Sequence, residues 1–128
     1  MTKIATSIEQ SKILKGILPL ESADMGWYYS KDPYAARNQM WLGTKVENAD
    51  LPAWSLAALL EILPSYLGEF KDGVDFGLSK SVNGKWYSAH YLKTSDDGDL
   101  SAVYVKTGDT SIDACYEMIV KLKEENVI

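Results

Sequence analysis

The sequence has few of the residues that usually carry out chemistry. It contains one cysteine (Cys115), one histidine (His90) and one arginine (Arg37) in 128 residues. A lone cysteine cannot form an internal disulfide, and one histidine with one cysteine is too few for a structural zinc site in a monomer. We therefore predict no metal, no cofactor and a reducing compartment.

The charge is acidic, and the basic residues are scattered. The formal net charge is −5, and twelve of the thirteen cations are lysines. Nucleic-acid-binding domains usually carry a basic stripe, and arginine makes most of the bidentate phosphate and guanine contacts. The first ten residues show no apolar signal core, and no apolar run reaches the roughly 20 residues that span a bilayer. We expect a cytoplasmic protein without nucleic-acid or membrane partners.

Residues 51–64 form the most apolar stretch, with a proline near each end. Its apolar positions surround nearly the whole helical circumference, so the sequence predicts a helix at the centre of one core. Four leucines on this helix should be buried: Leu56, Leu59, Leu60 and Leu63. The length and the 46% hydrophobic content predict a single domain over residues 1–128.

Two further helices have recognisable starts. Residues 6–9 have the form of a capping box, with Thr6 as N-cap and Glu9 three residues later, and predict a helix over 7–15 that ends at Gly16. Thr110 and Asp113 repeat this start before a helix over 111–125. On that second helix Met118, Ile119 and Leu122 fall on one apolar face.

Strand signals lie between the helices, at 25–29, 39–43, 74–81, 85–93 and 100–107. Asn83-Gly84 predicts a hairpin with a type I′ turn, which places Phe76 opposite Tyr91 and Gly77 opposite His90. The predicted fold is α+β, in the order α-β-β-α-β-β-β-α. It has about three helices and one antiparallel sheet of four or five strands.

No catalytic constellation is evident, which favours a protein that is not an enzyme. No nucleophile-elbow motif surrounds any serine, so His90 is interpreted as a partly exposed strand residue. Cys115 lies on the apolar face of the last helix and is interpreted as part of the core. Residues 96–99 lack the spacing of a calcium loop and are interpreted as a plain turn.

The aromatic residues are the most suggestive feature of the composition. The chain has four tryptophans and eight tyrosines, more than a small core buries completely. Core packing and a binding surface are both open interpretations, because Trp and Tyr are enriched at interfaces. A platform that stacks sugars or bases is a third. The candidate binding residues are Trp27, Trp41, Trp86 and His90.

Three parts of the chain carry a resemblance: residues 7–11 with 23–25, residues 51–60, and residues 112–114 with 122–125. In this order they resemble a family of small, functionally uncharacterised proteins that is frequent in gut Bacteroidales genomes and their prophages or mobile elements. The resemblance implies a mobile-element origin and a shared fold unit, but no activity. Residues 65–107 are not part of it.

Two functional hypotheses follow from these observations. The first is a non-enzymatic interaction or accessory module that binds a protein partner or associates with itself. It rests on the acidic composition, the surplus of aromatic residues and the missing catalytic motifs. The alternative is a small-molecule-binding protein or small enzyme with a site near His90 and Trp86 on the open face of the sheet.

Overall fold

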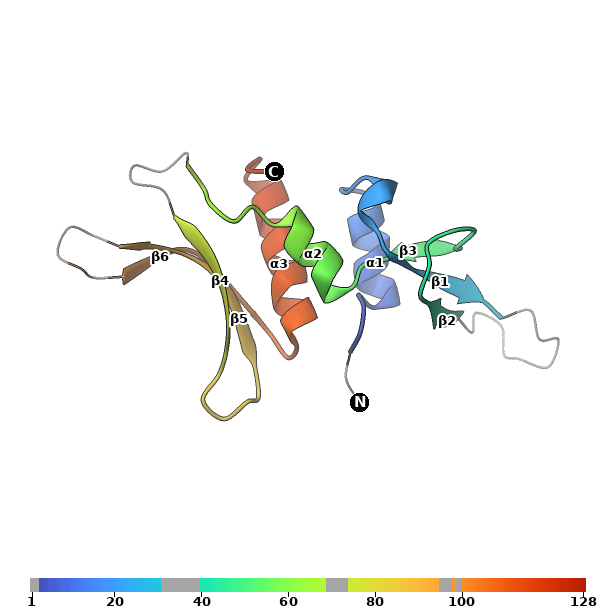
Figure 1. Cartoon of the computed structure of the whole chain (residues 1–128), viewed down its shortest axis with the longest axis horizontal. Helices are drawn as coiled ribbons and strands as arrows, with labels where there is room; N and C mark the ends of the chain where they lie inside the picture. Colours follow the sequence, from blue (N-terminus) through green and yellow to red (C-terminus); the bar gives the residue numbers. More distant parts are fainter. Residues whose placement is uncertain (1–2, 31–39, 69–73, 95–97, 99) are drawn as a thin grey trace. The chain divides into compact units, whose positions relative to one another are not determined.

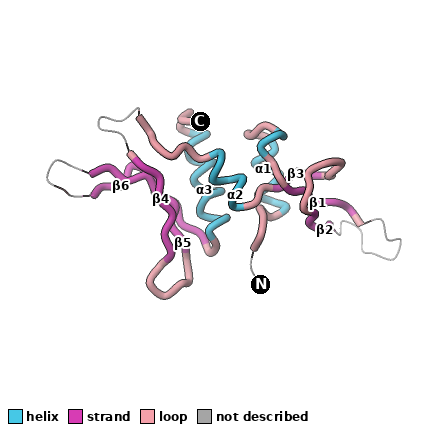
Figure 2. Tube along the Cα trace, in the orientation of Figure 1, coloured by secondary structure: helices cyan, strands magenta, loops and turns pink. Residues whose placement is uncertain are grey.

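A computed structural model describes residues 3–30, 40–68, 74–94, 98 and 100–128. The predicted turn at 96–99 lies outside the described residues except for residue 98, and Arg37 lies outside them as well. The described chain forms three α-helices, a short 3-10 helix and two three-stranded antiparallel sheets (Figures 1 and 2). In chain order the elements are α1 (Ile8–Lys15), η1 (Leu20–Ser22), β1 (Met25–Tyr29), β2 (Met40–Gly43), β3 (Leu51–Ala53), α2 (Leu56–Ile62), β4 (Asp75–Lys80), β5 (Tyr87–Thr94), β6 (Leu100–Gly108) and α3 (Ser111–Glu124).

The α+β class and the three helices are confirmed, but the arrangement of strands differs from the prediction. Instead of one sheet, the strands form a β2-β1-β3 sheet and a β4-β5-β6 sheet. The chain divides into two compact units, residues 1–58 and 59–128, each containing one of these sheets. The boundary between the units falls within α2.

The additional strand is β3, which was predicted as the start of the central helix. Its three residues pair antiparallel with β1, and Pro52 lies opposite Gly26. Proline is tolerated here because β3 is an edge strand and needs hydrogen bonds on one side only. Helix α2 therefore begins at Leu56, and the Ser55 hydroxyl accepts a hydrogen bond from the Ala58 N–H at 3.2 Å.

The first unit buries one face of its sheet. Met25, Ala53 and Ala5 form a buried cluster, against which Trp27 and Leu42 pack. Because side chains alternate along a strand, Gly26 and Tyr28 of β1 belong to the opposite face. Helix α1 contacts β3, the edge strand of this sheet.

The start of α1 is shifted by one residue from the prediction. Ser7 is the N-cap, and its capping box is completed by Gln10 rather than by Glu9. Thr6 is instead buried, where its hydroxyl accepts the Trp54 N–H at 3.1 Å and lies 2.7 Å from the Ser11 hydroxyl. Thr6 was misassigned because threonine suits an N-cap equally well, and only the contact with Trp54 distinguishes the two roles.

The second unit confirms the predicted hairpin register. Phe76 pairs with Tyr91 and Gly77 with His90. The turn type is wrong, because type I′ needs positive φ at both central residues and only Gly84, at 73°, has it. Ser81 closes the loop instead: its carbonyl accepts the Gly84 N–H at 2.9 Å and its hydroxyl accepts the Lys85 N–H at 3.1 Å.

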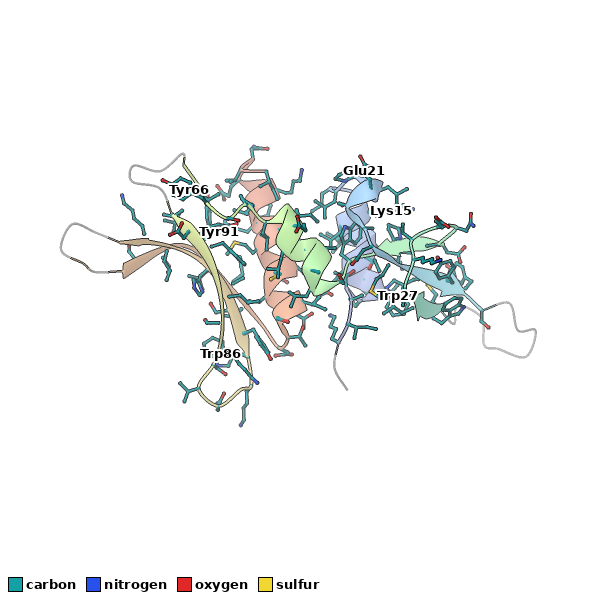
Figure 3. The ribbon with its side chains drawn as sticks, in the orientation of Figure 1. Lys15, Glu21, Trp27, Tyr66, Trp86 and Tyr91 are labelled. Atoms are coloured by element: carbon teal, nitrogen blue, oxygen red, sulfur yellow. The ribbon has the colours of Figure 1, made fainter. Side chains whose placement is uncertain are left out.

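Helix α3 contacts β5 and β6 and covers one face of their sheet. The predicted helix, its Thr110 N-cap and the burial of Met118, Ile119 and Leu122 are confirmed. Tyr91 lies between β5 and α3 (Figure 3) and is fully buried. Its ring packs against Phe76 at a centroid distance of 5.3 Å, and its hydroxyl donates to the Pro64 carbonyl at 2.6 Å.

Leu59 and Leu60 provide a matched test of α2. Leu59 is fully buried, whereas Leu60, predicted to be buried, is 38% exposed. We expect Leu59→Ala to lower the free energy of unfolding by about 2–5 kcal/mol through cavity formation, and Leu60→Ala to lower it far less. Urea denaturation measures both. Equal midpoints for the two variants would contradict the assignment of Leu59 to the core.

Cys115 is buried on α3, as predicted, and burial raises the pKa of its thiol to about 11. The pKa of Tyr91 is also raised, mainly by burial and to a smaller extent by the electrostatic interaction with the neighbouring Cys115. Because the native thiol keeps its proton while the unfolded thiol loses it, stability present below pH 9 should decline as the pH rises through about 11.

Two measurements test this burial. A thiol reagent at pH 8 should react with Cys115 only as fast as the protein unfolds. Cys115→Ala should flatten the alkaline decline of stability without abolishing it, because Tyr91 contributes to the same decline. A fast reaction of the folded protein at pH 8 would place the thiol at the surface.

Candidate binding site

An open pocket of about 680 Å³ lies in the first unit, beside the sheet face that carries Tyr28. We call it the aromatic pocket. Its volume falls within the range of about 300–1,000 Å³ that is usual for small-molecule sites. Strands β1 and β2 and the segment that follows β2 supply its lining residues: Tyr28, Tyr29, Trp41, Gly43, Thr44, Lys45, Asn48 and Asp50.

Two glycines make room for this pocket. Gly26 of β1 pairs directly with Gly43 of β2. A Cβ atom on Gly43 would lie 2.7 Å from Cε2 of Tyr28, and one on Gly26 would lie 2.4 Å from Cβ of Ala49. Any larger residue would collide at either position, so the pair is required for the Tyr28 ring and the segment 44–50 to approach the sheet.

Two aromatic rings form the centre of the pocket. The rings of Tyr28 and Trp41 stack with centroids 4.7 Å apart and planes 18° from parallel. The Tyr28 hydroxyl lies 2.8 Å from the Lys45 carbonyl and 2.6 Å from the Glu47 carbonyl, between which it shares its proton. Trp41 is nevertheless 54% exposed. The indole is therefore backed by a fixed ring while much of its own surface remains accessible.

The segment 44–50 holds the polar groups of the pocket. Asn48 has a positive φ of 59°, a conformation that asparagine tolerates better than most residues. Asp50 is tied to β1 twice: its N–H donates to the Trp27 carbonyl at 3.0 Å, and its carboxylate accepts the Tyr29 N–H at 2.7 Å. These bonds fix the Asp50 carboxylate at the edge of the aromatic pocket.

The four candidate residues fall in different places. Only Trp41 lines the aromatic pocket. Trp27 packs against the core on the opposite face of the same sheet, and its indole N–H donates to the Thr6 carbonyl at 3.1 Å. Trp86 and His90 belong to the second unit, and Figure 3 shows Trp86 at the hairpin between β4 and β5.

His90 lies across its partner Gly77 on the face of the second sheet opposite Tyr91. A Cβ atom on Gly77 would lie 2.4 Å from Nε2 of His90, so the imidazole covers the glycine. In the part of the chain that the structure describes, no hydrogen bond joins His90 to a serine or a carboxylate. On the same face of the sheet, Ser88 lies two positions before His90 in β5, and Val105 is the partner of His90 in β6.

Sequence reasoning missed the polar half of the aromatic pocket, namely Thr44, Lys45, Asn48 and Asp50. A signal was present in the two strand segments. Pairing Met-Gly-Trp-Tyr-Tyr antiparallel with Met-Trp-Leu-Gly, glycine opposite glycine, puts Tyr28 opposite Trp41. The position of residues 44–50 depends on contacts across the sheet that no local pattern reveals.

Among the described residues, no group of three His, Cys, Asp or Glu side chains could hold a metal ion. Within the same residues, no helix is both long enough and apolar enough to cross a membrane.

Comparison of the chain with protein-family models, with curated proteins and with solved structures found no match.

Gly43→Ala tests whether the glycine pair builds the pocket. The added methyl should displace the ring of Tyr28 or Trp41 and cost about 1–3 kcal/mol of stability through overpacking. Gly16→Ala is the control, because its added methyl would meet only the Ile13 carbonyl, at 3.4 Å. Urea denaturation and near-ultraviolet circular dichroism should change for Gly43→Ala alone. Identical stability and spectra for both variants would refute the close packing at Gly43.

Proposed function

We propose that the protein is a non-enzymatic binding module and that the aromatic pocket holds part of its partner. The observation that supports this is the Trp41 indole, half-exposed in an open pocket and backed by Tyr28. Exposing a large apolar ring to water is unfavourable, and a partner that covers the ring removes this penalty. Tryptophan is among the residues that contribute most to binding energy. The rest of the pocket supplies hydrogen-bonding groups around that ring.

The lining residues favour binding over catalysis. Covalent catalysis needs a nucleophile within hydrogen-bond reach of a base. The aromatic pocket is lined by neither histidine nor cysteine, and among the described residues no hydrogen bond joins the Thr44 hydroxyl to Asp50. The Asp50 carboxylate is already engaged by the Tyr29 N–H. In the proposed site, Asp50 fixes the loop 44–50 and accepts hydrogen bonds from the ligand.

Fluorine NMR of protein labelled with 5-fluorotryptophan can test the proposal directly. The chain has four tryptophans, so replacing each by phenylalanine assigns every resonance. We expect titration with a panel of saccharides, nucleosides, amino acids and short peptides to shift the Trp41 resonance. Trp41→Ala should weaken that binding by about tenfold or more.

Trp86→Ala and His90→Ala are the matched controls, because Trp86 is exposed to a similar extent, 46%, but lies in the second unit. Both variants should bind as the parent protein does. If a ligand instead shifts the Trp86 resonance, and its binding is lost in His90→Ala, the binding site lies on the second sheet and the alternative hypothesis is supported. A panel without binders, or binding that Trp41→Ala leaves unchanged, would overturn the proposal.

A further inference from the structure

We propose that the ligand of the aromatic pocket is a neutral pyranose sugar, which stacks the C–H face of its ring on Trp41 and hydrogen-bonds its hydroxyls to the loop 44–50. The inference rests on the proposed function and specifies its ligand class. Three properties of the pocket support it: a single flat apolar face, a mixed set of donors and acceptors, and a charge balance that disfavours anions.

The flat face comes from the ring stack. Because Tyr28 and Trp41 are stacked nearly parallel, at 18°, Tyr28 backs one face of the Trp41 indole and does not form a wall at an angle to it. A cage for a quaternary ammonium group uses several rings that surround the cation. A single supported face instead suits a flat ligand, such as a pyranose presenting its C–H groups or a nucleobase.

The polar groups around the platform match hydroxyls. A sugar hydroxyl both donates and accepts, so a site for it needs groups of both kinds. The lining provides the acceptor oxygens of Asp50, the donor ammonium of Lys45, and the Asn48 amide and Thr44 hydroxyl, which do both. One Asp50 oxygen accepts the Tyr29 N–H, and a carboxylate has further lone pairs for a sugar hydroxyl.

The charges argue against phosphorylated or carboxylated ligands. Among the described residues that line the pocket, Lys45 is the only cation, and the Asp50 carboxylate is fixed in the same pocket. Phosphate sites usually combine arginine, several backbone N–H groups or a helix N-terminus. An anionic group would meet one ammonium and one carboxylate among these described lining residues, which fit a neutral ligand better than a nucleotide.

Isothermal titration of the full chain with defined probes tests the ligand class. The neutral sugars are cellotriose, maltotriose, methyl glucoside, methyl galactoside and N-acetylglucosamine, and the competing chemistries are methyl glucuronide, adenosine and choline. We expect at least one neutral sugar to bind, and methyl glucuronide to bind more weakly than methyl glucoside, its neutral counterpart.

Variants then test the individual contacts. Trp41→Ala should weaken sugar binding by about tenfold or more through loss of the platform, and Trp41→Phe should weaken it less. Asp50→Asn keeps an acceptor for the Tyr29 N–H but removes the charge. This variant should weaken the binding of the neutral sugar by about tenfold, which corresponds to the loss of one charge-assisted hydrogen bond. It should also reduce the difference in affinity between methyl glucoside and methyl glucuronide. Trp86→Ala should leave binding unchanged.

The outcomes separate this inference from the proposed function. If adenosine or choline binds in a Trp41-dependent way and no sugar does, the pocket is a binding site but the ligand class is wrong. If sugars bind equally well to Trp41→Ala, the inference is wrong even though the protein binds sugars. If no probe binds to the aromatic pocket, the inference is refuted, and the fluorine NMR panel decides the proposed function independently.

Discussion

The candidate site depends on one steric constraint, the pairing of Gly26 with Gly43 across β1 and β2. Without side chains at these two positions, the Tyr28 ring lies close to the sheet and Ala49 comes within contact of Gly26. Tyr28 then supports Trp41, and its hydroxyl holds two carbonyls of the loop. The platform and the polar lining of the aromatic pocket therefore have a common cause.

The second sheet uses a similar device with a different result. Gly77 lies opposite His90, and the imidazole occupies the space that a side chain on Gly77 would take. Covering a strand glycine with a cross-strand ring protects its backbone and compensates for the missing side chain. Among the described residues, no loop is hydrogen-bonded to the His90 side chain as the loop 44–50 is to the Tyr28 hydroxyl. A ring over strand glycines thus lines the aromatic pocket in the first unit and covers Gly77 in the second.

Much of the fold could be predicted because its signals are local. The hairpin register could be predicted from Asn83-Gly84, although the turn itself adopts another type than predicted. Helix α3 could be predicted from its N-cap Thr110 and its apolar stripe. The errors arose where distant contacts decide. Leu51–Ala53 has the composition of a helix start, but its pairing with β1 makes it a strand. Trp41 was named from composition alone, whereas Asp50 acquires its role only through the Tyr29 N–H.

The way the pocket is held together bears on what it can do. A ligand gains most from a site whose groups are already ordered, because less conformational freedom is lost on binding. In the aromatic pocket the indole is backed by a ring, that ring is fixed through its hydroxyl, and the carboxylate is bonded to the strand. These bonds fix the Tyr28 hydroxyl and one oxygen of the Asp50 carboxylate in place. This fixed arrangement supports the proposal that the aromatic pocket binds a ligand, because little order has to be gained when the ligand enters.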